Sequence, residues 1–201
     1  MDSLLGRYYY ESPQTDAHGS ATLNPVIGSG LYTQNATYTI AADGTAYIGT
    51  IAAGAAGQYV DTGDYKCRET FMSFDTSVVP VDATVSSATL TVTANGDNTA
   101  QDFTVEVFAY DFGVAVDTTD WQDRSELTAG TLLASYDTSD GWTGSMVFTS
   151  ESAFLAAIVK GGTTRIVLAS DRHRAGTVPT INEWGSFYTT ATTLAELEVV
   201  W

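Results

Sequence analysis

CRETFMSFDTSVVPVDATVSSATLTVTA, residues 67–94, carries the clearest structural signal in the chain. In residues 87–94 apolar side chains occupy every second position with Thr between them, which is the period of a half-buried β-strand. Residues 67–74 indicate a second strand. Pro80 separates the two, because proline has no N–H and restricts the residue before it. The stretch therefore predicts two strands joined by a rigid crossing loop.

Similar patterns extend on both sides of this stretch. Asp43-Gly44 and Asn95-Gly96 predict tight hairpin turns, because Gly readily adopts the positive φ that such turns require. The small residues of 52–57 indicate a loop or a close-packed crossing. Further strands are predicted over residues 37–40, 45–51, 102–112, 132–136, 144–148, 164–170 and 195–201.

One helix is predicted, over residues 151–160, because Phe154, Ala157 and Ile158 share a face and Gly161-Gly162 follows. Residues 118–121 predict a capped single turn that packs Trp121 against the sheet. Many short strands with turns between them indicate an all-β fold. We expect a single antiparallel β-sandwich, jelly-roll-like, with one short helix, and a closed barrel is the alternative.

The first 35 residues differ from the rest in composition. They are rich in Ser, Gly, Asn and Pro with little periodicity, so residues 1–35 are predicted to form an N-terminal arm with at most short strands. Residues 36–201 are then the β-sandwich domain, a size that suits one domain. We expect the arm to lie across its own domain or against a neighbouring subunit.

Charge and cysteine content exclude several classes of partner. The net charge of −16, from 24 acidic and 8 basic residues, disfavours nucleic acid and anionic membranes as partners. A single cysteine, Cys67, excludes an internal disulfide and a cluster of thiolate metal ligands. The chain begins without a recognisable secretory signal, so either a signal was removed or the protein leaves its host by another route, such as lysis. Retention of Met1 favours the second alternative.

Catalytic motifs are weak. The only histidines are His18 and His173, no G-x-S-x-G turn is present, and Cys67 lies within a strand pattern. Acidic pairs suit glycoside hydrolysis or Ca²⁺ binding, but Asp more often caps turns. We therefore expect no catalytic residues and no cofactor, with structural Ca²⁺ at residues 61–64 left open. The pairs are Asp61 with Asp64, Asp120 with Asp123, and Asp171 with Glu183.

Two groups of residues are candidates for binding. Arg172, His173 and Arg174 form a small basic cluster, with Arg165 on the preceding strand. Their guanidinium groups suit carboxylates of a partner, although pairing with Asp171 and Glu183 to hold the loop is the simpler interpretation. Exposed aromatic rings suit interface anchors or sugar stacking. Candidates for protein contacts are Tyr8, Tyr9, Tyr10 and Trp184, and those for glycans are Trp142, Trp184 and Tyr188.

The strand pair at residues 67–94 also carries a family resemblance. The run 68–77, RETFMSFDTS, followed by Pro80, Ala83-Thr84-Val85 and 87–90, resembles the opening of DNRLRE-type β-sandwich domains. Residues 60–201 as a whole resemble uncharacterised proteins of tailed phages and environmental viruses. This second resemblance includes Tyr110-Asp111-Phe112-Gly113, Thr119-Asp120-Trp121 and the loop 170–183, SDRHRAGTVPTINE. It implies no catalytic residues.

These observations favour a non-enzymatic virion structural protein of a tailed phage: a capsid decoration, head-fibre or tail-associated subunit. Its expected partners are other virion proteins and further copies of the same chain, and its expected location is the virion. The alternative is a carbohydrate-binding or adhesion module that recognises glycans. A glycan-cleaving enzyme that uses two of the acidic residues is the third hypothesis, because fold alone does not fix function.

Overall fold

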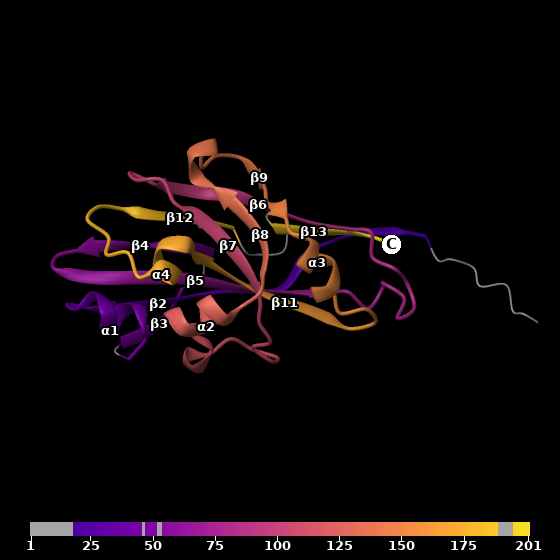
Figure 1. The fold of residues 1–201 in the computed structure, drawn as a ribbon, viewed down its shortest axis with the longest axis horizontal. Coiled ribbons are helices and arrows are strands. Elements are labelled where there is room, and N and C mark those ends of the chain that lie inside the picture. The colour runs from indigo at the N-terminus through magenta and orange to yellow at the C-terminus, as the bar shows by residue number, and fades with distance from the viewer. Residues whose placement is uncertain (1–17, 46, 52–53, 189–194) are drawn as a thin grey trace, which may run out of the picture.

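The structure is a computed structural model and describes residues 18–45, 47–51, 54–188 and 195–201. It is mostly β, with one large antiparallel sheet of 13 strands and several short helices (Figure 1). The molecule is broad where the hairpin between β4 and β5 lies, and it narrows toward β1 and the C-terminus. No helix in these ranges is long and apolar enough to cross a membrane.

The hydrogen-bonded strands follow one path, with three strands attached beside it. The path runs β1-β13-β6-β12-β4-β5-β11-β7-β8-β10, while β2 pairs with β3 and β5, and β9 pairs with β6. The bounds are β1 (Ser20–Leu23), β2 (Pro25–Asn35), β3 (Tyr47–Ile51), β4 (Gly54–Asp61), β5 (Asp64–Asp75), β6 (Ser87–Asn98), β7 (Thr104–Ala109), β8 (Leu132–Asp137), β9 (Ser145–Val147), β10 (Thr149–Ser150), β11 (Thr163–Ser170), β12 (Glu183–Phe187) and β13 (Ala195–Val200).

The strands predicted within residues 67–94 lie at the centre of this network. β5 contains the first and pairs with β2 along one edge, while β4 and β11 share the other edge. β6 contains the second. It pairs with β13 and β9 through residues 87–93, and with β12 through residues 94–98.

Side chains bury both faces of β5. Met72 and Phe74 join a large cluster that also contains Leu90 of β6 and Leu197 of β13, together with residues of β7 and β11. The alternate residues Cys67 and Phe71 join a second cluster with Leu31, Tyr38 and Trp121. Alternation along one strand thus supplies two cores, because successive side chains point to opposite faces.

The helix content differs from the prediction of one short helix. Within the described ranges the structure has α1 (Tyr38–Ala42), α2 (Arg124–Ala129), α3 (Ser152–Ala157), α4 (Asp171–Ala175) and two short 3₁₀ turns, η1 (Thr118–Asp120) and η2 (Thr138–Asp140). The predicted helix is confirmed as α3, and the capped turn as η1, with Trp121 buried after it.

The strand predicted over residues 37–40 is wrong. This segment forms α1, where Tyr38, Ala41 and Ala42 are buried. Their spacing of three and four residues places them on one side of a helical turn, so burial against the second cluster favours the helix.

Two other local predictions are also wrong. Asn95-Gly96 forms no hairpin, because β6 continues to Asn98 and pairs there with β12, with a register shift between Ser186 and Phe187. The small residues after Ile51 belong largely to β4 rather than to a loop. Ala55 and Ala56 are buried within it, so a strand of small side chains fits close beneath its neighbours.

Residues 20–35 belong to the sheet rather than to an arm with short strands. β1 pairs with β13, and β2 is an 11-residue strand that pairs along most of β5. Alternate residues of β2 such as Leu31 are buried, which explains why this segment is ordered as a strand despite its polar composition. Residues 1–17 of the predicted arm lie outside the described residues.

Candidate functional site

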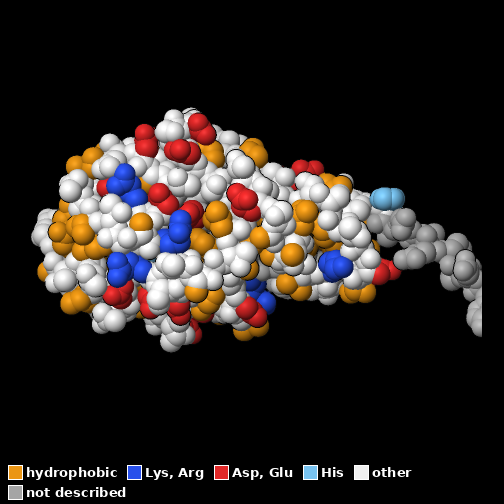
Figure 2. All heavy atoms as spheres, viewed as in Figure 1, with side chains coloured by type: hydrophobic (Ala, Val, Ile, Leu, Met, Phe, Trp, Pro, Cys, Tyr) orange, Lys and Arg blue, Asp and Glu red, His pale blue; other side chains and the backbone are white. Residues whose placement is uncertain are grey.

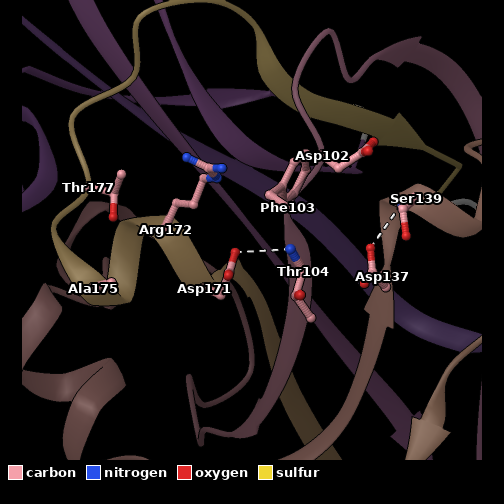
Figure 3. Close-up of a pocket in the computed structure, with 9 residues that line it drawn as sticks. All are labelled: Asp102, Phe103, Thr104, Asp137, Ser139, Asp171, Arg172, Ala175 and Thr177. Atoms are coloured by element: carbon pink, nitrogen blue, oxygen red, sulfur yellow. Dashed lines mark hydrogen bonds between the residues drawn. The ribbon is translucent and has the colours of Figure 1, made fainter.

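The basic cluster predicted at residues 172–174 lies on α4, beside a cleft of about 450 Å³ (Figure 3). The hydroxyl of Ser170 caps this helix by accepting from the Arg172 N–H, and Gly176 ends it with a left-handed backbone conformation, φ 71°. The loop that precedes β7 and the first residue of β7 form another side of the cleft. There the Thr104 N–H donates to the carboxylate of Asp171 over 2.9 Å.

A buried polar network holds Arg172. Its guanidinium lies 3.5 Å from the carboxylate of Glu183, which is almost completely buried. Burial raises the pKa of Glu183, and the bond that Gln58 donates over 3.1 Å partly offsets that rise. Tyr38 in turn donates to the Gln58 side-chain oxygen over 2.7 Å. Arg172 therefore links α4 to the first residue of β12, which agrees with the predicted pairing with Glu183, whereas Asp171 accepts from the Thr104 N–H instead.

Arg174 has a structural partner as well. Its Nε and NH2 groups each donate over 2.6 Å to the carboxylate of Glu106 on β7, a side chain that is 7% exposed. This two-pronged geometry gives strong, directional charge-assisted hydrogen bonds. Arg174 thus links α4 to β7, although its own side chain is 37% exposed.

His173 is not available to a partner, contrary to the prediction. Its side chain is fully buried, its Nε2 lies 2.8 Å from the carbonyl oxygen of Ala42, and its ring packs at 5.4 Å from the ring of Trp121. Its Nδ1 lies 3.4 Å from the carboxyl of Glu69, which is also fully buried. Burial lowers the pKa of His173 to about 4 and raises that of Glu69 well above its ordinary value.

The predicted acidic pairs mostly cap turns and hold strands. Asp61 and Asp64 lie at the two ends of the turn between β4 and β5, where Asp61 binds Lys66 and Asp64 accepts from Gln34. Asp123 caps α2. Asp120 completes the capping box of η1 and also accepts from the hydroxyl of Tyr110. Within the described ranges no group of three or more His, Cys, Asp or Glu residues could hold a metal ion.

The three aromatic residues predicted as glycan contacts have different surroundings. Trp142 is buried in the large core, its indole N–H donates to the Ser186 carbonyl, and it packs over Gly185. The prediction that Trp142 is an exposed ring for sugar stacking is therefore wrong, because this ring is buried in the core. Tyr188 is 41% exposed. Tyr8, Tyr9 and Tyr10 lie outside the described residues.

Trp184 remains partly exposed and belongs to a row that the sequence did not reveal. The Arg68 guanidinium carbon lies 3.8 Å from the centre of the Trp184 ring and 4.9 Å from that of Tyr59. Arg68 also donates to the Tyr59 hydroxyl over 2.7 Å, and the Lys66 ammonium lies 5.5 Å from the same ring. We call Tyr59, Lys66, Arg68 and Trp184 the aromatic–cation row.

Strand register explains how this row forms. Gly57 of β4 pairs with Arg68 on one side and with Trp184 on the other. Because Gly57 has no side chain, Arg68 can reach across it to the indole. At the broad end of the molecule, hydrophobic and basic atoms lie close together on a surface that also carries many acidic groups (Figure 2).

No protein-family model matches this chain, and no curated protein is similar to it.

Proposed function

We propose that this protein is a non-enzymatic structural subunit of a tailed-phage virion that acts through protein–protein contacts. A capsid decoration, head-fibre or tail-associated position fits this function, with other virion proteins and further copies of the chain as partners. The resemblance of residues 60–201 to viral proteins suggests the setting, and the aromatic–cation row supplies the contact surface.

The arrangement of the strands supports a jelly-roll-like sandwich for this subunit. The large core joins side chains of β6 and β13 to those of β5, β7 and β11, as expected where two layers of strands face each other. β6 belongs to both layers, since its first half pairs with β13 and its second half with β12. Such a block presents side chains on a rigid surface, which lowers the entropy lost on binding.

The aromatic–cation row is the observation that carries the proposal. Trp, Tyr and Arg are the residues most enriched among those that dominate protein–protein binding energy, and all three meet here. Arg68 is held by its contacts with Tyr59 and Trp184, so little side-chain freedom is lost when a partner covers the row. Because Lys66 is paired with Asp61, the positive charge of Arg68, on a chain of net charge −16, is the one that favours a partner surface presenting carboxylates or carbonyl groups.

Incorporation into particles tests this function. Virions of the phage that encodes the chain are purified with the native sequence, with Trp184→Ala or with Tyr188→Ala, and the copy number is measured by quantitative mass spectrometry. Tyr188 is a partly exposed aromatic residue without a place in the row and serves as the matched control. We expect native copy number for Tyr188→Ala and a loss of at least tenfold for Trp184→Ala. Absence of the native chain from purified virions would contradict the proposal.

A further inference from the structure

A second aromatic feature lies at the edge of the sheet, beside the aromatic–cation row but with different chemistry. Tyr32 of β2 and Tyr47 of β3 have ring centres 5.7 Å apart, and their hydroxyl oxygens are 3.3 Å apart. With Gln34, Asn35, Ala36 and Asp64 they line an open hollow of about 440 Å³. We call this the tyrosine hollow.

The Tyr32 ring packs against the backbone of β3. Gly49 of β3 pairs with Tyr32, and a Cβ at Gly49 would lie 2.5 Å from Cε1 of the Tyr32 ring. The Tyr32 ring therefore packs directly against the backbone of β3 at Gly49. Tyr47 is 60% exposed, which leaves much of its surface open to a ligand. The exposed Tyr47 ring, in contact with the Tyr32 ring, offers a large aromatic contact area.

The polar groups of the hollow present mainly hydrogen-bond acceptors. The amide nitrogen of Gln34 donates to one carboxylate oxygen of Asp64 over 2.6 Å, and the side-chain oxygen of Asn35 accepts from the Thr37 N–H over 2.8 Å. The side-chain oxygen of Gln34 and the second carboxylate oxygen of Asp64 can each accept a hydrogen bond from a hydroxyl, and the Asn35 amide nitrogen can donate one.

The charge around the hollow selects among ligands. Asp64 brings a negative charge to its lining, and the nearby ammonium of Lys66 is paired with Asp61 at 2.9 Å. The whole chain carries a net charge of −16. Anionic groups, including acidic sugars and acidic peptides, are therefore disfavoured.

We propose that the tyrosine hollow binds a neutral sugar, whose C–H face stacks on Tyr47 and whose hydroxyls donate to Gln34 and Asp64. A sugar combines these two requirements, because a pyranose ring has an apolar face and a rim of hydroxyl donors. The site differs from the aromatic residues that the sequence suggested for glycans, and it does not depend on the particle contacts proposed for the aromatic–cation row.

A glycan array tests this proposal with the full-length protein. The array carries neutral oligosaccharides of glucose, galactose, mannose and N-acetylglucosamine beside sialylated and sulfated glycans, and the best neutral binder is then titrated by calorimetry. We expect neutral glycans to bind. Tyr47→Ala is expected to weaken binding at least tenfold, whereas Val114→Ala, at an exposed side chain that does not line the hollow, stays within about twofold of the native protein.

A second variant separates ring position from ring presence. Gly49→Ala keeps both tyrosines, but its Cβ would displace the Tyr32 ring from its position against β3. We therefore expect this variant to weaken binding as well. Circular dichroism confirms that each variant is folded, which the exposure of Tyr47 favours. The proposal is overturned if no neutral glycan binds at millimolar concentration, if only acidic glycans bind, if Tyr47→Ala binds like the native protein, or if Tyr47 proves to contact a particle protein instead.

Discussion

The guanidinium carbon of Arg68 lies 3.8 Å from the centre of the Trp184 ring, although the two residues are separated by more than half of the chain. They meet because β4 pairs with both β5 and β12 and has Gly57 between them. This contact joins the basic and aromatic side chains of the aromatic–cation row, and its contribution to the free energy of unfolding can be measured.

Replacing Arg68 by Lys tests the strength of this stack. Lysine keeps the charge but loses the flat group that lies over the indole and donates to Tyr59. We expect Arg68→Lys to lower the free energy of unfolding by about 1 kcal/mol, because cation–π contacts at exposed sites contribute on the order of 0.5–1 kcal/mol. Urea denaturation measures the loss, with Tyr59→Phe as the control that removes only the hydroxyl. An unchanged stability for Arg68→Lys would show that the flat group contributes nothing.

Gly57 and Gly63 provide a matched pair of backbone tests. Both have positive φ, 121° and 92°, so alanine is strained at either position. A Cβ at Gly57 would also lie 2.1 Å from the Glu183 carbonyl oxygen, whereas a Cβ at Gly63 meets nothing within 4 Å. We expect Gly63→Ala to cost about 1 kcal/mol and Gly57→Ala at least about 3 kcal/mol, from strain plus displacement of β12. Thermal unfolding compares them, and equal losses would contradict the packing at Gly57.

The buried pair of Glu69 and His173 predicts an unusual dependence of stability on pH. His173 has its folded pKa lowered from 6.5 to about 4, so its contribution is complete above pH 6.5 and is lost as pH falls toward 4. Glu69 has its folded pKa raised above 4.5, so its contribution is complete below pH 4.5 and is lost as pH rises toward the folded pKa. Between pH 4.5 and 6.5 the two effects oppose each other.

Replacing one residue of this pair should reveal how the other makes the free energy of unfolding depend on pH. Relative to the native protein, Glu69→Gln is expected to gain about 2 kcal/mol of stability as pH rises from 4.5 to 6.5, because the lowered pKa of His173 is then no longer offset over these two pH units. His173→Gln is expected to lose stability relative to Glu69→Gln over the same interval. Chemical denaturation at a series of pH values checks both, and parallel curves for all three proteins would contradict the pair.

The Arg174–Glu106 contact predicts a non-additive mutant cycle. Arg174→Met leaves the nearly buried Glu106 carboxylate without its partner, which we expect to cost about 1–3 kcal/mol after allowance for the partial exposure of Arg174. Combining it with Glu106→Met removes the isolated charge, so the double variant is expected to recover much of the loss. Guanidinium denaturation of the four proteins measures the coupling. Simple addition of the two single losses would argue against a stabilising pair.

Much of the β-structure could be predicted, because alternating burial leaves a direct trace in the sequence. β6 and β13 follow that period closely and have one face in the large core, whereas β11 is buried on both faces, with Ile166 in one core and Val167 in the other. The failures occur where tertiary pairing overrides local signals. Asn95-Gly96 has a strong turn preference, yet β12 supplies hydrogen bonds that extend the strand through it.

The binding surfaces were less predictable than the strands. The aromatic–cation row brings Tyr59, Arg68 and Trp184 together from three strands, and no local pattern encodes that register. The same holds for Tyr32 and Tyr47 across β2 and β3. His173 shows the reverse error, because a basic run in a polar loop gave no sign that its middle residue fills a core beside Trp121.

Chemical cross-linking within purified virions tests the central claim most directly, because the chain has only two lysines and they lie in different surroundings. Lys66 belongs to the aromatic–cation row, whereas Lys160 donates to the Ala83 carbonyl near the end of α3. After treatment with an amine-reactive cross-linker and digestion, we expect Lys66 to be joined to another virion subunit and Lys160 not to be. Cross-links from Lys160 alone, with Lys66 labelled to the same extent in virions as in the isolated protein, would contradict the account.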